Sequence, residues 1–401
     1  QMGIQERLLK KFWNNLMKKF IYILFFIFSL SSLGQEYSLM EKFVLPSEVE
    51  ETSGLIFLNG KIITHNDSGD DPNLYEIDTI SGTISRIINI TNATHIDWED
   101  ISQDNTYIYI ADIGNNNGDR DNLIIYKILK SDFISSTSVT AEQITFSYED
   151  QTDFTSQPNN SNFDAEAIAV YQENIFIFSK NWVDFKTNAY VIPTATGNYS
   201  AEKVSSYDSQ GLITGVSYNA STDGFLFCGY NNTLIPFLLY VGHDRPSSLD
   251  IFGGIPTRID LIDSIFLEQG SQIEGITFFE DSKYYISREF FSTNIGAVTF
   301  EFPQKLYEFY NPLDNLLSIT DNEFSNLIYV VPNPIEDSFK IIQKNKHQEI
   351  QSFSLFSLDG RTIFFKKKQD EIDLKNISKG VYLLKIEFKN DRNVVKKVIK
   401  K

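Results

Sequence analysis

The sequence predicts an all-β protein: a five-bladed β-propeller followed by a small immunoglobulin-like β-sandwich, with a six-bladed propeller as the alternative. Two observations lead to this prediction. A short motif that opens a strand recurs five times between residues 53 and 276, and each copy is followed by further strands and turns. The last 75 residues carry a different strand pattern that is rich in lysine. Four strands per repeat are typical of a propeller blade, whereas a sandwich has no reason to repeat one motif.

The repeated motif is three residues long and ends in an aliphatic residue. Its copies are Ser53-Gly54-Leu55, Glu99-Asp100-Ile101, Glu166-Ala167-Ile168, Thr214-Gly215-Val216 and Glu274-Gly275-Ile276. After a turn, each copy is followed by a second apolar strand that ends in a small residue. These second strands end at Thr64, Ala111, Ser179, Cys228 and Ser287.

Two more strands are expected in most repeats. The third strands are expected around Tyr75, Tyr126, Tyr190, Tyr240 and Val298, and the fourth at residues 84–90, 143–148, 203–207 and 257–261. The fifth repeat has no evident fourth strand, while residues 39–45 form an unassigned strand before the first repeat. We therefore expect residues 39–45 to complete the fifth blade and close the ring.

The N-terminal segment has the pattern of a secretory signal peptide that starts at Met17. Lys18 and Lys19 precede the apolar run 20–30, and the small residues Ser32 and Gly34 stand at cleavage-site positions. The run is shorter than the roughly 20 residues of a membrane span, so no transmembrane anchor is expected. Residues 1–34 are then an upstream extension and signal peptide, and the mature chain begins near Gln35.

Charge divides the chain. Residues 35–326 hold 14 of the 35 Lys and Arg but 43 of the 53 Asp and Glu residues. So acidic a region repels nucleic acid and would take an anionic substrate only through a cation, although acidity also simply keeps exported proteins soluble. Cys228 is the single cysteine, so no disulfide framework is expected.

The C-terminal region shows three local signals of a β-sandwich. Val331-Pro332-Asn333-Pro334 predicts an extended entry, Asp359-Gly360 a hairpin turn, and the alternating run 380–385 a half-buried strand. These motifs, with Pro332, Asn333, Pro334, Gly380 and Tyr382 as the signature residues, resemble the C-terminal sorting domain of the type IX secretion system of Bacteroidota. The resemblance implies a partner, the type IX secretion machinery, and a destination outside the cell or on its surface, reached through the periplasm. We therefore divide the chain into residues 35–315 (propeller passenger), 316–326 (linker) and 327–401 (sorting domain).

The residue that opens each repeat should lie at one rim of the propeller channel, because the first strand of each blade lines that channel. The end of the antiparallel second strand lies beside it. The rim candidates are therefore Ser53, His65, Glu99, Asp112, Glu166, Lys180, Glu274 and Arg288. Trp98 and Trp182 lie close to them in sequence and would either stack on a sugar or pack between blades.

Three interpretations of this rim remain open. Glu166 with Lys180, and Glu274 with Arg288, could be ion pairs that only hold the rim together. Alternatively Glu99, Asp112, Glu166 and Glu274 could supply the oxygen ligands that calcium prefers, although the sequence makes no cofactor certain. Finally, two of these carboxyl groups could act as acid and base on a glycan.

Residues 51–78 resemble the opening blade of secreted propellers grouped as phytase-like or esterase-like, through Ser53-Gly54-Leu55 and Asn66-Asp67-Ser68-Gly69. The resemblance implies a propeller, and no activity is carried over from it. Common nucleophile, zinc and phosphate-loop motifs are absent from the sequence. The sequence thus leaves open whether the passenger is an enzyme: it predicts an exported protein that binds a glycan or another extracellular small molecule at the rim, with a calcium-dependent hydrolase of phosphoesters or glycans as the alternative.

Overall fold

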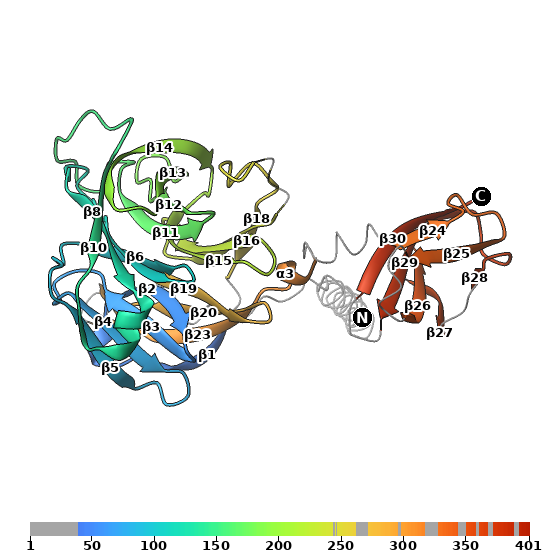
Figure 1. Ribbon diagram of the computed structural model, residues 1–401, viewed down its shortest axis with the longest axis horizontal. Helices are drawn as coiled ribbons and strands as arrows, with labels where there is room; N and C mark the ends of the chain where they lie inside the picture. Colours follow the sequence, from blue (N-terminus) through green and yellow to red (C-terminus); the bar gives the residue numbers. More distant parts are fainter. Residues whose placement is uncertain are drawn as a thin grey trace, which may run out of the picture. The chain divides into compact units, whose positions relative to one another are not determined.

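The computed structural model describes residues 39–243, 245, 247–261, 272–295, 298–316, 328–343, 350–357, 361–367, 372–388 and 393–401. Strands are the dominant secondary structure of these residues and helices are few and short, which confirms the all-β class (Figure 1). The expected signal peptide, the Asp359-Gly360 turn and residues 317–326 of the expected linker lie outside the described residues. No helix in the described ranges is both long and apolar enough to cross a membrane.

Within residues 39–310, the described strands form five antiparallel groups of four. The first group consists of β2 (Thr52–Leu58), β3 (Lys61–Asn66), β4 (Asn73–Asp78) and β5 (Ile84–Ile90). The second consists of β6 (Trp98–Gln103), β7 (Tyr107–Asp112), β8 (Leu123–Leu129) and β10 (Glu142–Tyr148). The third consists of β11 (Ala165–Tyr171), β12 (Asn174–Ser179), β13 (Thr187–Pro193) and β14 (Gly197–Tyr207). The fourth consists of β15 (Leu212–Asn219), β16 (Gly224–Tyr230), β17 (Pro236–Val241) and β18 (Thr257–Asp260). The last is β19 (Ile273–Glu280), β20 (Lys283–Arg288), β23 (Lys305–Tyr310), β1 (Leu39–Val44).

Short elements join or decorate these groups. Strand β10 pairs in parallel with β14, which merges the second and third groups into one eight-stranded sheet. The small strand β9 (Ser138–Val139) likewise pairs in parallel with β5. The other short elements are η1 (Ser47–Val49), α2 (Lys130–Ser135), α3 (Leu313–Leu316) and the hairpin β21 (Phe291–Ile295) and β22 (Val298–Phe302).

The first strands of the five groups lie against one another in a closed cycle, in the order β2, β6, β11, β15, β19 and back to β2 (Figure 1). Polar side chains tie neighbouring strands of this cycle. The Asp100 carboxylate accepts a hydrogen bond from the Ile168 amide at 2.8 Å, and the Thr214 hydroxyl donates one to the Ile273 carbonyl at 2.6 Å. The cycle is thus held by side-chain hydrogen bonds in addition to packing.

The middle residue of the repeated motif sets how closely these first strands approach. A Cβ atom on Gly275 would lie 2.3 Å from the Ser53 carbonyl oxygen, and one on Gly215 would lie 2.3 Å from the Glu274 carbonyl oxygen. No real Cβ tolerates a contact that short, so only glycine fits at these two positions. The glycines at the centre of the motif are therefore required by close packing between first strands.

Strand β1 completes the fifth group, as expected for residues 39–45. It pairs antiparallel with β23 over Leu39–Val44, so the N-terminal strand of the described chain joins the sheet of the last repeat. The expected position of the third strand of that repeat, around Val298, is wrong. The third strand is β23, which pairs with β20, while Val298 begins β22 in an inserted hairpin.

Apolar side chains fill the space between neighbouring sheets. One cluster joins the second and third groups through Tyr109, Ile125, Ile168 and Tyr190, all of them buried. Other clusters join the first group to the second, the third to the fourth and the first to the fifth. Burial of a large apolar side chain contributes about 1.5–3 kcal/mol, so these inter-sheet layers supply much of the stability.

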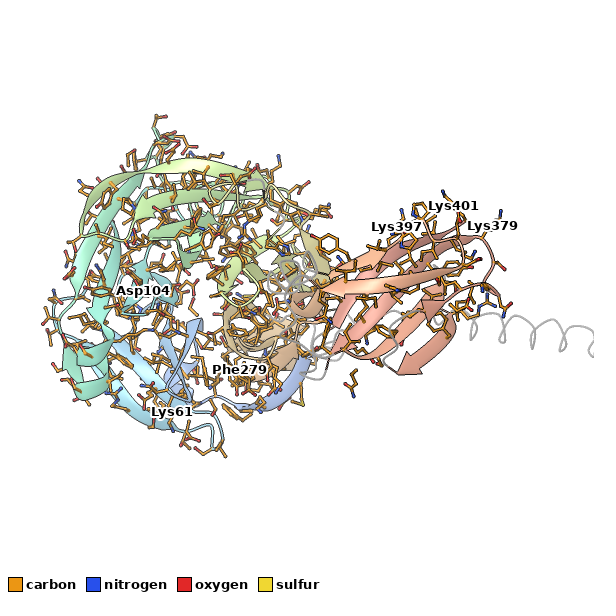
Figure 2. All side chains as sticks on the ribbon, turned by 45° about the vertical axis from the view of Figure 1, so that its right-hand side comes forward. Lys61, Asp104, Phe279, Lys379, Lys397 and Lys401 are labelled. Carbon is orange, nitrogen blue, oxygen red and sulfur yellow. The ribbon has the colours of Figure 1, made fainter. Side chains whose placement is uncertain are left out.

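The C-terminal domain consists of two small sheets around a core of its own. The strands are β24 (Ile328–Val331), β25 (Ser338–Gln343), β28 (Ile372–Asp373) in one sheet and β27 (Thr362–Lys367), β26 (Ile350–Ser357), β29 (Gly380–Phe388), β30 (Asn393–Lys400) in the other. Its surface carries many lysines, among them Lys379, Lys397 and Lys401 (Figure 2).

The signature residues of this domain have local structural roles. The Asn333 side chain donates to the Lys397 carbonyl and accepts from the Ile399 amide, both at 2.9 Å, and so fixes the entry segment to β30. Tyr382 lies in the core and its hydroxyl donates to the Ser378 carbonyl at 2.8 Å. Gly380 begins β29.

Candidate functional site

A β-bulge in each inner hairpin places the candidate site. The pairing register of the first and second strands shifts in all five described groups, and each shift falls at the residue that opens the repeated motif. The residues in these bulges are Ser53, Glu99, Glu166, Thr214 and Glu274. A bulge re-aims the side chain at its extra residue and often lies next to a functional site.

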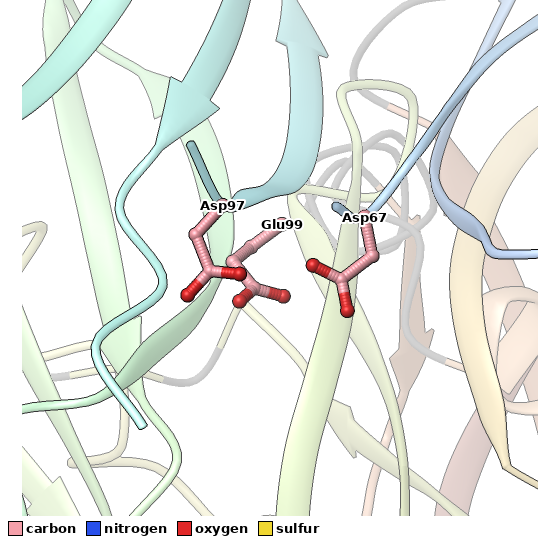
Figure 3. A group of neighbouring side chains, drawn as sticks. All are labelled: Asp67, Asp97 and Glu99. Carbon is pink, nitrogen blue, oxygen red and sulfur yellow. The ribbon is translucent and has the colours of Figure 1, made fainter. Parts of the chain in front are cut away.

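Seven carboxyl groups influence one another electrostatically at this end of the ring. They belong to Asp67, Asp97, Glu99, Asp164, Glu166, Glu274 and Glu289. Carboxylate oxygens of Asp67, Asp97 and Glu99 all lie within 4.8 Å of one another (Figure 3). The same distance limit holds for Glu99, Asp164 and Glu166, so Glu99 belongs to both groups.

Lys180 is the basic residue that neutralises part of this charge. Its Nζ lies 2.7 Å from Glu166 Oε1, and both side chains are buried, so the expected Glu166–Lys180 ion pair is present. Burial acts to lower the pKa of Lys180, but the carboxylates, Glu166 foremost, raise it well above its usual value. The ammonium also lies over the rings of Trp182 and Tyr230.

Asp112 serves a second ion pair beside the cluster. Its carboxylate contacts Arg120 at 2.8 Å and accepts a hydrogen bond from the Asp97 amide at 3.2 Å. The Arg120 guanidinium also donates to the Gly114 carbonyl at 2.6 Å. Asp112 therefore orients the segment that carries Asp97, and it belongs to neither three-carboxylate group.

Asp164 is satisfied by donors on two loops. The backbone amide of Asn115 donates to Asp164 Oδ1 at 2.7 Å, and the Trp182 indole donates to Asp164 Oδ2 at 2.8 Å. Trp182 is only half-buried. Trp98, in contrast, is fully buried and stacked on His95, so of the two tryptophans only Trp182 is accessible.

The end of the ring that carries the seven carboxyl groups is called the opening below. Several carboxyl oxygens there have no hydrogen-bond donor among the described residues. They are Asp67 Oδ1, Glu99 Oε1 and Glu274 Oε2, and they come from three different sheets. Burial and the neighbouring acids raise the pKa of Glu99 and of Asp67 well above their usual values, and the same causes raise the pKa of Glu289 to about 9. Like charges about 4 Å apart repel by roughly 4 kcal/mol at an effective dielectric constant of about 20, so the cluster favours a proton or another cation.

The remaining predicted rim residues have structural partners. His65 is fully buried, burial lowers its pKa to about 3, and its Nδ1 lies 2.9 Å from the Asn66 carbonyl. The Ser53 hydroxyl donates to the Glu99 carbonyl across two sheets, and Arg288 donates to the Pro303 carbonyl at 2.6 Å. His65 is therefore neutral at physiological pH and enclosed by protein.

The candidate set predicted from the sequence does not contain Asp67, Asp97, Asp164 or Glu289. Asp97 and Asp164 each precede a repeat-opening glutamate by two residues, in the patterns Asp97-Trp98-Glu99 and Asp164-Ala165-Glu166. Asp97 and Asp164 directly precede β6 and β11, and the bulge at each glutamate breaks the two-residue alternation of side chains. The repeated spacing therefore identifies both aspartates only together with that bulge. The structure thus shifts the candidate ligand set from Glu99, Asp112, Glu166 and Glu274 toward the groups centred on Glu99.

Residues 328–401 match the family described as the secretion system C-terminal sorting domain. This match confirms the expected sorting domain, which is handled by the type IX secretion machinery, and the protein is therefore exported, to the cell surface or beyond it. No curated protein matches the chain.

Solved structures resemble the chain only distantly. The alpha-L-arabinanase of Penicillium chrysogenum complexed with arabinobiose is 13% identical over 66% of this chain and 82% of its own, with a TM-score of 0.35. The extracellular domain of a putative one component system from B. thetaiotaomicron is 10% identical over 91% of this chain and 60% of its own, with a TM-score of 0.32. Kuenenia stuttgartiensis hydrazine synthase is 8% identical over 61% of this chain and 57% of its own, with a TM-score of 0.33. The chain thus spans less than two thirds of the latter two, and no argument about function rests on these likenesses.

Proposed function

We propose that this exported protein is a five-bladed β-propeller, residues 35–315, which binds an extracellular ligand at the acid-lined opening of its ring. Residues 316–326 would be a linker and residues 327–401 an immunoglobulin-like sorting domain. The closed cycle of five first strands and the pairing of β1 with β23 support the blade number. A ring closed by its own N-terminal strand leaves its central opening as a natural place for a ligand.

One observation carries the binding proposal. Buried carboxyl oxygens of Asp67, Glu99 and Glu274 converge from three sheets without a donor among the described residues. Leaving a buried polar atom unsatisfied costs about 1–3 kcal/mol, and such atoms in a native protein call for an explanation. A ligand that donates hydrogen bonds or positive charge would satisfy them.

The chemistry of the opening suits a polyhydroxylated ligand such as a glycan. Carboxylates accept hydrogen bonds from hydroxyl groups, and the accessible indole of Trp182, held by Asp164, offers an apolar face beside them. Ligand sites of this kind combine a few fixed polar groups with aromatic surface.

Glycan arrays probed with labelled residues 35–401 test this proposal. We expect at least one glycan class to bind, and the Glu274→Gln variant to lose tenfold or more in affinity for it. Glu280→Gln is the matched control, because Glu280 lies on the same strand β19 but is exposed and paired with Lys283. Equal binding by the wild type and Glu274→Gln would contradict a ligand at this opening.

A calcium-dependent hydrolase of phosphoesters or glycans is the second candidate function. It is favoured by the neighbouring carboxyls of Glu99 and Glu166, whose pKa values are both raised, by burial above all, as a general acid requires. The likeness to phytase-like and esterase-like propellers supplies no further support. This candidate predicts turnover of a phosphoester or glycoside that Glu166→Gln abolishes, whereas the binding proposal predicts none.

A further inference from the structure

We infer that Asp67, Asp97 and Glu99 bind one hard divalent cation, with calcium as the ion that this site suits best. The inference rests on the proposed function, because it names a component of the same ligand-binding opening. It differs from the sequence-based ligand set in two residues out of three, Asp67 and Asp97.

The three carboxylates come from segments that are fixed relative to one another. Asp67 follows β3, Asp97 directly precedes β6, and Glu99 lies in the bulge of β6. The Asp67 carbonyl accepts a hydrogen bond from the Trp98 amide at 2.8 Å, which ties the first segment to the second. The ligand oxygens therefore belong to a framework that does not need to rearrange.

Their spacing fits a shared ion. One oxygen from each residue lies within 4.8 Å of the others, and the side chains point toward a common space (Figure 3). Calcium binds oxygen at about 2.3–2.6 Å, so two oxygens that share it are at most about 5 Å apart. The spacing of the three oxygens is therefore compatible with one shared ion.

Glu99 supplies a separate sign that something is bound. Its side chain is only 2% exposed, and Oε1 has no hydrogen-bond partner among the described residues. A carboxylate in that position is one of the more costly groups to bury in a protein. A cation beside Oε1 would remove that cost.

Gly114 allows the backbone of its loop to approach the same oxygens closely. A Cβ on Gly114 would lie 2.0 Å from Glu99 Oε1 and 2.4 Å from Asp97 Oδ2. The Gly114 backbone is itself fixed, since its amide donates to the Asp97 carbonyl and its carbonyl accepts from Arg120. The loop thus forms a wall against which the two carboxylates are packed together.

The nearby protein cations are engaged elsewhere. Lys180 is paired with Glu166, and Arg120 is paired with Asp112. In the described ranges, no ion pair is formed by Asp67, Asp97 or Glu99. The second group, Glu99 with Asp164 and Glu166, is a weaker candidate because Asp164 already accepts two hydrogen bonds and Glu166 holds Lys180.

Asp67 and Asp97 are only half-buried, which leaves a hydrated ion a route to Glu99. Calcium takes six to eight oxygens, so three carboxylates leave positions for water or for hydroxyl oxygens of the ligand. The ion would then contribute directly to ligand binding at the opening.

Calorimetric titration of residues 35–401 with calcium, magnesium and manganese chlorides tests the inference. We expect one ion per chain, with a calcium Kd in the range of about 10⁻⁴–10⁻³ M that is typical of extracellular sites. Glu99→Gln and Asp97→Asn should each weaken calcium binding tenfold or more. Gly114→Ala should do so as well, although it removes no carboxylate, because the new Cβ would displace Glu99 Oε1 and Asp97 Oδ2.

Two controls make the result specific. Glu280→Gln, on the exposed end of β19, should bind calcium as the wild type does, and Asp164→Asn, in the competing group, should weaken calcium binding less than Asp97→Asn does. Circular dichroism in chelator shows which variants are folded, and an unfolded variant is replaced by the other carboxylate variant. No binding of any of the three ions, or loss in Asp164→Asn with retention in Asp97→Asn, would overturn the assignment. Glycan binding that persists in chelator would overturn only the contribution of the cation to ligand binding and leave the proposed function standing.

Discussion

At the residue scale, the opening of the ring is defined by how carboxylates are paired. Glu166 and Asp112 each have a basic partner, Lys180 and Arg120, whereas Glu99 and Asp67 retain buried oxygens with no donor in the described ranges. Paired and unpaired acids therefore lie side by side, and they have different roles. The paired ones stabilise the opening, and the unpaired ones are available to a ligand.

Removing Lys180 should destabilise the protein strongly. Lys180→Met leaves Glu166 buried without its partner, and breaking a buried ion pair in this way costs about 3–5 kcal/mol. Urea unfolding followed by circular dichroism measures the change. Lys283→Met is the control, because Lys283 pairs with Glu280 on the surface and such exposed pairs contribute little to stability. Equal effects of the two substitutions would show that the Glu166–Lys180 pair is not structural.

The sequence predicted the pairing of Glu166 with Lys180 because both flank strands whose antiparallel register is set by the hairpin. It could not predict Arg120 as the partner of Asp112, since Arg120 reaches back from a loop eight residues later. Asp97 and Asp164 were predictable from the repeated Asp-x-Glu spacing, but only once the bulge that aligns both residues with the opening is considered. Local pattern thus identified the first residue of the motif, and tertiary contacts decided the chemistry of its neighbours.

At the element scale, the repeated motif both allows close packing of the first strands and directs a side chain toward the opening. Its middle residue allows two first strands to approach, and its first residue lies in a bulge that faces the opening. The same three positions therefore set both the ring geometry and the site. A change in the middle residue should affect stability, and a change in the first should affect binding.

Gly275→Ala tests the packing role. The new Cβ would meet the Ser53 carbonyl at 2.3 Å, a backbone contact that cannot move aside without shifting β2. We expect a loss of about 1–3 kcal/mol in the free energy of unfolding, the usual cost of overpacking. Gly380→Ala provides the comparison, since its Cβ would meet nothing closer than 3.5 Å. An unfolding free energy of Gly275→Ala within about 0.5 kcal/mol of the wild type would contradict the close approach.

The fifth group shows where sequence pattern reaches its limit. Residues 298–302 alternate like a third strand, but they belong to an inserted hairpin, and β23 takes their place beside β20. Both segments satisfy the local rule for a strand, and only pairing distinguishes them. The contribution of residues 39–45 was easier to predict, because a ring needs a partner for its last sheet.

Deleting residues 39–44 should open the ring. Strand β23 would lose its antiparallel partner and become an exposed edge, which favours association with other chains. We expect a lower melting temperature and a larger species in size-exclusion chromatography. A control deletion of residues 35–38, just outside the described strand, should leave both unchanged. A monomer of unaltered melting temperature after deletion of 39–44 would show that β1 does not close the structure.

At the scale of the whole molecule, the chain joins two regions of opposite charge. The region of residues 35–326 is strongly acidic, and the sorting domain that follows is basic. The sorting domain accounts for export, and we propose that the acid-lined opening in the exported region binds the ligand. Each can therefore be tested without the other.

Removal of residues 332–401 should block export. The truncated chain lacks most of the sorting domain and should accumulate in the periplasm, as measured by fractionation and immunoblotting. The Glu99→Gln variant of the full chain is the control and should be exported normally. Surface delivery of the truncation would contradict the role of the domain in this chain.

The central claim is that the opening of the ring binds a cation, which in turn helps to bind a ligand. Thermal unfolding of residues 35–401 in calcium and in chelator tests the cation most directly. A ligand at about 100 times its Kd stabilises the native state by about 2.7 kcal/mol. The account predicts that saturating calcium raises the melting temperature by several degrees and that Glu99→Gln abolishes the rise. The same melting temperature in calcium and in chelator would contradict it.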